Sequence, residues 1–321
     1  MVRKLPTRLM LLLLGATFLA TGCELTEVTT AQGEDVLVVE SVLRPDMVQQ
    51  RVLLHRTLRG STVRGEPGAR VAVRTEGGRE IVFQEAPAGT CYSVNARYRR
   101  GEDSLVVEAT CYRSPLSAGS WVVPGARYEL DVRPRSGGRA RGSTRLPARF
   151  ELRGLTRARM ESDGTLVCTL PPGTPLPLAW SVSGGAWAYL TEVEITGLRD
   201  VLARQGIANV PEPLELIGVS VSERDTTVIV PTEVGIFDRF SLEQDLLRAI
   251  QGGLPAGVTA RITVAAADRN FINSVRGGAF NPSGNVQLSS IVGDGIGVFG
   301  SVNPRRLRVD VRAGASSNPC L

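Results

Sequence analysis

Short segments in which apolar and polar residues alternate, bounded by glycine and proline, restrict this chain to a mainly β fold. The clearest example places Ala69–Glu76 and Arg79–Glu85 on either side of Gly77-Gly78. Glycine reaches positive φ without strain, so this segment predicts a hairpin closed by a two-residue primed turn. Period two places four apolar side chains inward, namely Val71, Val73, Ile81 and Phe83, and three charged ones toward water, namely Arg70, Arg74 and Glu80.

The rest of the chain repeats this pattern, and its 35 glycines and 19 prolines supply the turns. Further strands are predicted at Val36–Val42, Arg51–Leu58, Tyr128–Val132, Val258–Ala265 and Leu307–Val311. Leu178–Val182 and Trp187–Ile195, separated by Gly184-Gly185, predict another hairpin, with Trp180 in the core of a fibronectin-like sandwich.

Helices are few. Ser241–Gln251 has an apolar stripe and a capping box formed by Ser241 and Gln244, so it predicts a helix packed on a sheet. Asp200–Gln205 predicts a short helix, and Arg269–Val275 predicts a brief helical or bent segment.

These elements predict two β-sandwich domains, and 321 residues suffice for two cores. Residues 35–150, which end just after Leu146-Pro147, are expected to form an immunoglobulin-like or carboxypeptidase-regulatory-like sandwich. Residues 151–321 are expected to form a fibronectin-like sandwich with helical insertions, and they include the proline-dense segment Cys168–Pro177.

Residues 1–22 have the three parts of a secretory signal peptide. Arg3, Lys4 and Arg8 precede the apolar run Leu9–Ala20, and small residues follow as far as Cys23. A membrane-spanning helix needs about 20 apolar residues, and this run has only about a dozen. The segment therefore predicts a cleaved signal.

The small residues before Cys23, with Leu19 just upstream, resemble the lipobox of bacterial lipoproteins. In such proteins the cysteine thiol receives a diacylglycerol, the signal is cut before it, and the new N-terminus is usually acylated; palmitate is the expected acyl group. Two or three acyl chains give a lasting membrane anchor. The alternative is an ordinary secretory signal whose cleavage site contains Cys23. Residues 23–34 are polar and acidic and predict a tether, or less closely a surface-export signal.

Four cysteines remain in the mature chain, at Cys91, Cys111, Cys168 and Cys320. An even number in an exported protein predicts two disulfides, with three possible pairings. Gly101 lies midway between the first two, so a hairpin turning there would place Cys91 opposite Cys111 and leave Cys168 for Cys320.

The net charge of the chain does not indicate a nucleic-acid partner. The formal net charge is +5, but three positive charges belong to the signal peptide, which leaves about +2. Lys4 is the only lysine, so arginine is the usual basic residue of this chain. Arg133–Arg145 carries five arginines among glycines, and a solvated hairpin tip is favoured over an anion-binding patch.

The residue types and motifs of this chain predict no enzyme, no metal and no cofactor. His55 is the only histidine, which leaves no histidine pair for a metal, and it is interpreted as a surface or edge residue. Gly295–Gly300 matches GxGxxG, but the residues after it predict a strand, so a glycine-rich turn between strands is favoured over a dinucleotide site. The pairs Glu223/Asp225 and Glu212/Glu215 have loop-like surroundings and no supporting donors.

The C-terminal region contains four short motifs in order, namely Asn281-Pro282, Asn285-Val286, Ser289–Ile291 and Gly295–Gly300. Together they resemble the closing signature of an uncharacterised family of Gram-negative outer-membrane lipoproteins, a domain-of-unknown-function family. Five other features match the family in order, namely Cys23, Val38–Glu40, the Gly77-Gly78 hairpin, Pro124–Tyr128 and Leu146-Pro147. This chain departs from the family at Phe271-Ile272 and in its cysteines. The resemblance implies an outer-membrane lipoprotein often encoded beside TonB-dependent receptors, without established catalytic residues.

The function expected from these features is that of a non-enzymatic, lipid-anchored protein of the cell envelope, an accessory or binding partner of an outer-membrane transport or receptor system. Two other classes stay open. One is an envelope hydrolase that acts on glycan or peptide through carboxylates, and the other is a purely structural or adhesive envelope protein.

Overall fold

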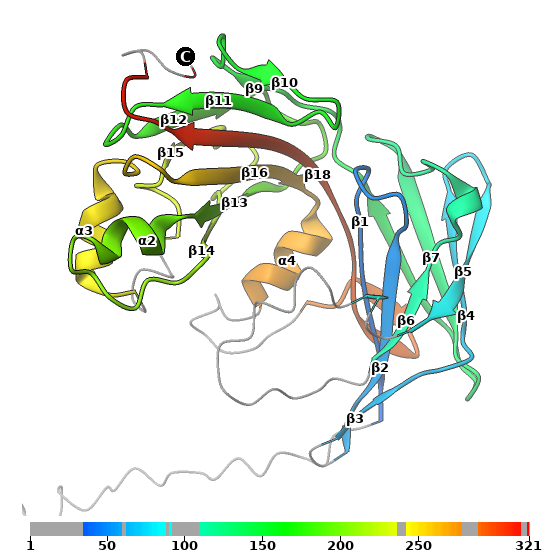
Figure 1. Cartoon of the computed structure of the whole chain (residues 1–321). Coiled ribbons are helices and arrows are strands. Elements are labelled where there is room, and N and C mark those ends of the chain that lie inside the picture. Colours follow the sequence, from blue (N-terminus) through cyan, green and yellow to red (C-terminus); the bar gives the residue numbers. More distant parts are fainter. Residues whose placement is uncertain are drawn as a thin grey trace, which may run out of the picture. The chain divides into compact units, whose positions relative to one another are not determined.

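Strand β18 spans Gly295–Val311 and connects strands from the two ends of the sequence. In the computed structural model its first residues pair in parallel with β1 (Leu37–Leu43). Its later residues pair with β16 (Thr259–Ala267) and with β11 (Leu166–Leu170). Figure 1 shows β18 running from β1 into the sheet that contains β16 and β13. The structure describes residues 35–321 except 60–61, 88–89, 92–108, 236–241, 278–287, 316–319 and 321.

Strands make up most of the regular structure, which confirms the mainly β class. The strands of the first half are β2 (Arg51–Arg59), β3 (Thr62–Gly65), β4 (Arg70–Thr75), β5 (Glu80–Ala86), β6 (Thr110–Arg113), β7 (Arg127–Arg133) and β8 (Ala140–Arg145). The remaining strands are β9 (Leu152–Arg153), β10 (Arg159–Met160), β12 (Leu176–Trp180), β13 (Ala188–Thr196), β14 (Leu214–Val219), β15 (Thr227–Val230) and β17 (Ile291–Gly293). The helices are α2 (Leu198–Ala203), α3 (Gln244–Gln251) and α4 (Arg269–Gly277), with a 3-10 turn at Leu116–Ala118.

A first hydrophobic core lies within the strands that run in the order β18-β1-β2-β6-β5-β4-β7-β8-β17. Because only Asp294 separates β17 from β18, this path returns to the strand where it began. Trp121 packs edge-on against Phe83 and Tyr128, with ring centroids 6.2 and 5.7 Å apart. Phe299, from the far end of the sequence, is also buried in this core.

The hairpin of β4 and β5 is confirmed, but its turn differs from the predicted one. Val71, Val73, Ile81 and Phe83 are buried as expected. Thr75 and Arg79 are joined by a hydrogen bond of 2.9 Å, and the Gly78 N–H donates to the Thr75 carbonyl, also at 2.9 Å. The loop therefore has three residues, and Gly78 alone among them has positive φ, at 83°. One left-handed glycine closes such a turn, so the two-residue primed turn is wrong.

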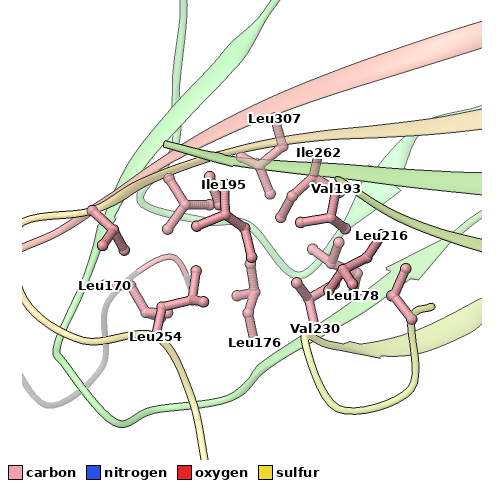
Figure 2. Packing of buried hydrophobic residues seen from close by; sticks show 14 of the residues in the cluster. Leu170, Leu176, Leu178, Val193, Ile195, Leu216, Val230, Leu254, Ile262 and Leu307 are labelled. Carbon is pink, nitrogen blue, oxygen red and sulfur yellow. The ribbon is translucent and has the colours of Figure 1, made fainter. Parts of the chain in front are cut away.

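A second core lies between two layers of strands. The three-stranded sheet β15-β12-β9 forms one layer, and β14, β13, β16, β18 and β11 form the other. Figure 2 shows Leu176 and Leu178 of β12 pointing toward Val193, Ile262 and Leu307 of the facing strands. This half thus has the layers of a sandwich. Residues 35–321 form one compact unit, and the boundary at residue 150 stays a prediction, as do the immunoglobulin-like and fibronectin-like assignments.

The hairpin predicted around Gly184-Gly185 is wrong. Strand β12 pairs with β15 and β9, whereas β13 pairs with β14 and β16, so this segment connects two sheets. Hydrogen bonds fix the connection: the Ser183 hydroxyl donates to the Ala148 carbonyl at 2.7 Å, and the Ser183 N–H donates to the Tyr189 hydroxyl at 2.8 Å. Trp180 is 3% exposed and packs edge-on against Tyr189, which confirms its place in the core.

Helices α2 and α3 contribute apolar side chains to the second core, with Leu202, Leu246 and Ile250 among them. Helix α3 begins at Gln244, three residues later than predicted, and Glu243 precedes it without a side-chain cap. Ser241, the other half of the predicted capping box, lies outside the described residues. No helix in the described part of the chain is long and apolar enough to cross a lipid bilayer.

Helix α4 covers the opposite face of β16 and β18. Ile272 lies in a third apolar cluster with Ala265, Ala267 and Val302. A Cβ at Gly300 would lie 2.9 Å from Cβ of Phe271, so glycine at this position lets the helix approach the strand closely.

A buried aspartate at the start of α4 joins the two halves. The Asp268 carboxylate accepts hydrogen bonds from the Thr144 hydroxyl at 2.6 Å, the Phe271 N–H at 2.9 Å and the Ser301 N–H at 3.1 Å. Burial raises the pKa of Asp268 above its ordinary value, and these hydrogen bonds offset only part of that effect. Asn303 adds a further hydrogen bond between the two halves, because its side-chain amide donates to the Ala148 carbonyl at 2.8 Å.

The glycines of Gly295–Gly300 lie inside β18 and not in a turn, which corrects the sequence interpretation. Gly297 has φ of 125°, and a Cβ there would lie 2.1 Å from the carbonyl oxygen of Val39 on β1. Glycine is required because any side chain would push the two paired strands apart.

We expect Gly297→Ala to lower the free energy of unfolding by about 2 kcal/mol or more, since it adds a clash to a strained φ. Gly164→Ala is the matched control, because Gly164 also has positive φ but nothing within 4 Å of its Cβ position. Urea unfolding of both variants measures the difference. Equal losses in the two variants would contradict the close approach of β1 to β18.

Asp268 should make stability depend on pH with a defined sign. Its folded pKa lies above its unfolded one, so the ionised carboxylate costs folding free energy at neutral pH. That cost disappears as the pH falls through the folded pKa toward the ordinary value of 3.8. Relative to Asp268→Asn, the wild-type protein should therefore gain free energy of unfolding as the pH falls over this range.

Thr144→Val should move this pH range upward, because it removes a hydrogen bond that lowers the pKa of Asp268. Urea unfolding at several pH values tests this, and a difference that stays constant with pH would contradict it.

Candidate functional site

A groove with a volume of ≈ 740 Å³ lies on the outer face of β4, β7 and β8. Its lining contains five arginines, namely Arg70, Arg74, Arg133, Arg139 and Arg141, and three acidic residues, namely Glu80, Glu129 and Asp131. The hairpin β4–β5 supplies three of these charged residues, and the hairpin β7–β8 and its connecting turn supply the other five.

Strand pairing brings these side chains together. Alternation directs every second residue of β7 and β8 outward, which exposes Glu129, Arg133 and Arg141. Asp131 lies opposite both Ala72 of β4 and Arg141 of β8, so the three residues form one row across the sheet. Ala72 is only 2% exposed although it belongs to the outward row. Its short side chain leaves the space between the arginines.

Asp131 is the centre of the ion pairs in this groove. Its carboxylate accepts hydrogen bonds from Nε of Arg133 at 3.0 Å and from Nε of Arg139, and it lies 3.7 Å from a guanidinium nitrogen of Arg70. Glu80 pairs with Arg70 and with Arg74, the latter at 3.4 Å. The acidic residues thus hold the guanidinium groups in fixed positions beside one another.

The pKa of Asp131 is lowered below its ordinary value. Burial alone raises it, but hydrogen bonds from Arg139 and Arg133 and the charges of both arginines outweigh that effect. Asp131 is therefore ionised at neutral pH and acts as a fixed counterion for the arginines around it.

Two charged groups of the groove make no ion pair with any residue that the structure describes. They are Arg141, opposite Asp131 on β8, and Glu129, opposite Arg74 on β4. Both are exposed, so each offers its full hydrogen-bonding capacity to solvent or to a ligand.

The sequence pattern of Arg133–Arg145 favours a solvated hairpin tip over an anion-binding patch. In the structure, three of its arginines line the groove together with Arg70 and Arg74, which lie more than fifty residues earlier in the chain. The alternating pattern predicted that Arg70 and Arg74 face water, but only the pairing of β4 with β7 brings the two segments together.

The sequence-predicted site residues are distributed over the chain. Cys23 lies outside the described residues. The pairing of the other cysteines is confirmed: Cys91 is bonded to Cys111 and Cys168 to Cys320, with Cα atoms 5.8 and 5.3 Å apart. The expected facing strands are wrong, however. Cys111 in β6 lies opposite residues of β2 and β5, and Cys91 lies in the turn region after β5.

His55 is not an edge residue, because β2 pairs with β1 on one side and with β3 and β6 on the other. Its side chain is 17% exposed and lies 3.7 Å from the carboxylate of Glu40. Burial lowers the pKa of His55, but the hydrogen bonds to Glu40 and to the Arg56 carbonyl and the charge of Glu40 outweigh burial and raise it.

One carboxylate from each of the pairs Glu212/Glu215 and Glu223/Asp225 accepts hydrogen bonds from backbone N–H groups. Glu212 accepts hydrogen bonds from the N–H groups of Gly197 and Arg199 at 2.8 and 3.2 Å, at the start of α2. Asp225 accepts the Ser222 N–H at 2.9 Å within a turn. Among the described residues, no group of three or more His, Cys, Asp and Glu side chains could hold a metal ion.

Comparison with known proteins leaves the family open. No family model matches the sequence, and no curated protein matches it. The crystal structure of trypsin activated alpha-2-macroglobulin from Escherichia coli aligns with 74% of this chain and 15% of its own, with 11% identity and a TM-score of 0.18. The chain thus spans a small part of that protein, and a likeness at this level supports no conclusion about fold or function.

Proposed function

We propose that this protein is a non-enzymatic binding protein of the Gram-negative cell envelope, anchored to the outer membrane by acyl chains on Cys23. The groove of arginines around Asp131 supports this proposal most directly. A guanidinium group stays charged at every physiological pH and offers five N–H donors in a fixed plane, so a row of them suits recognition of a ligand.

The disulfides support location outside the cytoplasm. Cys91–Cys111 and Cys168–Cys320 would form and persist in an oxidising compartment such as the periplasm. The signal-like segment before Cys23 agrees with export. The anchor and tether would hold the folded residues close to the membrane, where a binding protein meets transport receptors. A TonB-dependent receptor is the partner that the family resemblance implies.

The ionisation of Asp131 favours binding over acid–base catalysis at the centre of the groove. A general acid or base works best with a pKa near the operating pH. Asp131 has instead a lowered pKa and is surrounded by arginines that keep it ionised. We therefore place the groove residues in ligand binding and assign none of them a catalytic role.

Cys23→Ser should remove the protein from the outer-membrane fraction, because the thiol that would receive the lipid is absent. Fractionation of cells expressing the variant and the wild-type protein measures this. Crosslinking in native membranes of the wild-type strain, followed by purification, should recover a TonB-dependent receptor. Mass spectrometry of the mature wild-type N-terminus is the control, and an unmodified Cys23 would contradict the anchor.

A further inference from the structure

The groove presents more positive charge to solvent than its composition suggests. The side chains of Arg70, Arg74, Arg133 and Arg139 are 44–59% exposed. The side chain of Asp131, by contrast, is 20% exposed and that of Glu80 is 34% exposed. Asp131 and Glu80 are therefore less exposed than the arginines that they pair with, and the surface that meets a ligand is rich in N–H donors.

Acceptors and hydroxyl groups stand beside these donors. Glu129 makes no ion pair with the described residues, and Ser143 lies opposite it on β8. Ser290 also lines the groove, and its hydroxyl oxygen accepts the Phe299 N–H at 2.8 Å, so this hydroxyl group can still donate its own hydrogen. Together with Arg141, the groove offers guanidinium donors, a carboxylate acceptor and hydroxyl groups within one surface.

On these grounds, and resting on the binding function proposed above, we infer that the groove binds an acidic polysaccharide. Arginine would bind carboxylate or phosphate groups on the sugar rings through paired, charge-assisted hydrogen bonds. Glu129 would repel a ligand made only of anionic groups, but it would accept hydrogen bonds from sugar hydroxyls. A ligand that carries acid groups and hydroxyls together therefore matches the groove best. The volume of ≈ 740 Å³ is that of a site for an extended small ligand, so several sugar rings would fit.

A protein or nucleic-acid ligand fits this surface less well. Protein interfaces have an apolar, often aromatic centre. In the described lining, Val292 is the only exposed apolar side chain, since Leu130 and Ala72 are covered. The lining contains no aromatic ring within the described residues on which a nucleic-acid base could stack.

Binding of oligogalacturonate to the full lipidated protein in detergent tests this inference by calorimetry. We expect saturable binding that weakens as salt is added. Arg141→Ala should reduce the affinity by about tenfold, since it removes a charge-assisted hydrogen bond. Glu129→Ala should also weaken the binding, although it makes the groove more positive. Arg224→Ala is the matched control: it removes the same charge from a side chain that is 88% exposed and outside the groove, and it should change nothing.

The comparison ligands are polyglutamate and a neutral maltooligosaccharide. Both should bind weakly or not at all. Equal affinity for polyglutamate, equal losses in the Arg141 and Arg224 variants, or tighter binding by Glu129→Ala would each overturn the inference in favour of unspecific charge attraction. Thermal unfolding of each variant shows whether it is folded. These outcomes leave the anchor at Cys23 unaffected, so the two proposals fail separately.

Discussion

The parallel pairing of β1 with β18 is the interaction on which the rest of this structure depends. It places the final strand beside the first one, so that Phe299 fills the first core and Leu307 fills the second. Val302, between them, contributes to the cluster beneath α4. One continuous strand therefore passes through all three apolar clusters. The pairing requires glycine at residue 297, because the Val39 carbonyl occupies the space that a side chain would need.

Local patterns predicted local structure well. Alternation placed Val71 and Phe83 inward, and the aromatic residue after the proline-dense segment, Trp180, is in the core as expected. Predictions for segments whose structure depends on partners distant in the sequence were wrong. The glycines of Gly295–Gly300 predict a turn by their pattern, since nothing in the sequence shows that β1 runs alongside them. Gly184-Gly185 likewise has the residues of a hairpin turn, but sheet membership is decided by β15 and β16, which lie elsewhere in the chain.

The candidate groove also depends on pairing between segments that are distant in the sequence. Its arginines come from two hairpins. The sequence predicts the first as paired strands with charged outer residues, but for the second it predicts only the strand Tyr128–Val132 and a solvated tip at Arg133–Arg145. What could not be predicted is that β4 pairs with β7, because sequence alone carries no register between segments so far apart. The disulfides are an instructive case: the pairing of Cys91 with Cys111 was predicted correctly, but their proximity comes from the turn after β5 and not from facing strands.

The central claim is that β18 couples the two cores into one cooperative unit, and native-state hydrogen exchange tests it most directly. If the claim holds, the β18 amides of Phe299, in the first core, and of Leu307 and Val309, in the second, exchange only through global unfolding. Their opening free energies should then agree and equal the free energy of unfolding measured with urea. Exchange of the Phe299 amide at a much lower opening free energy than the Leu307 amide would contradict the claim, because the first half would then unfold independently.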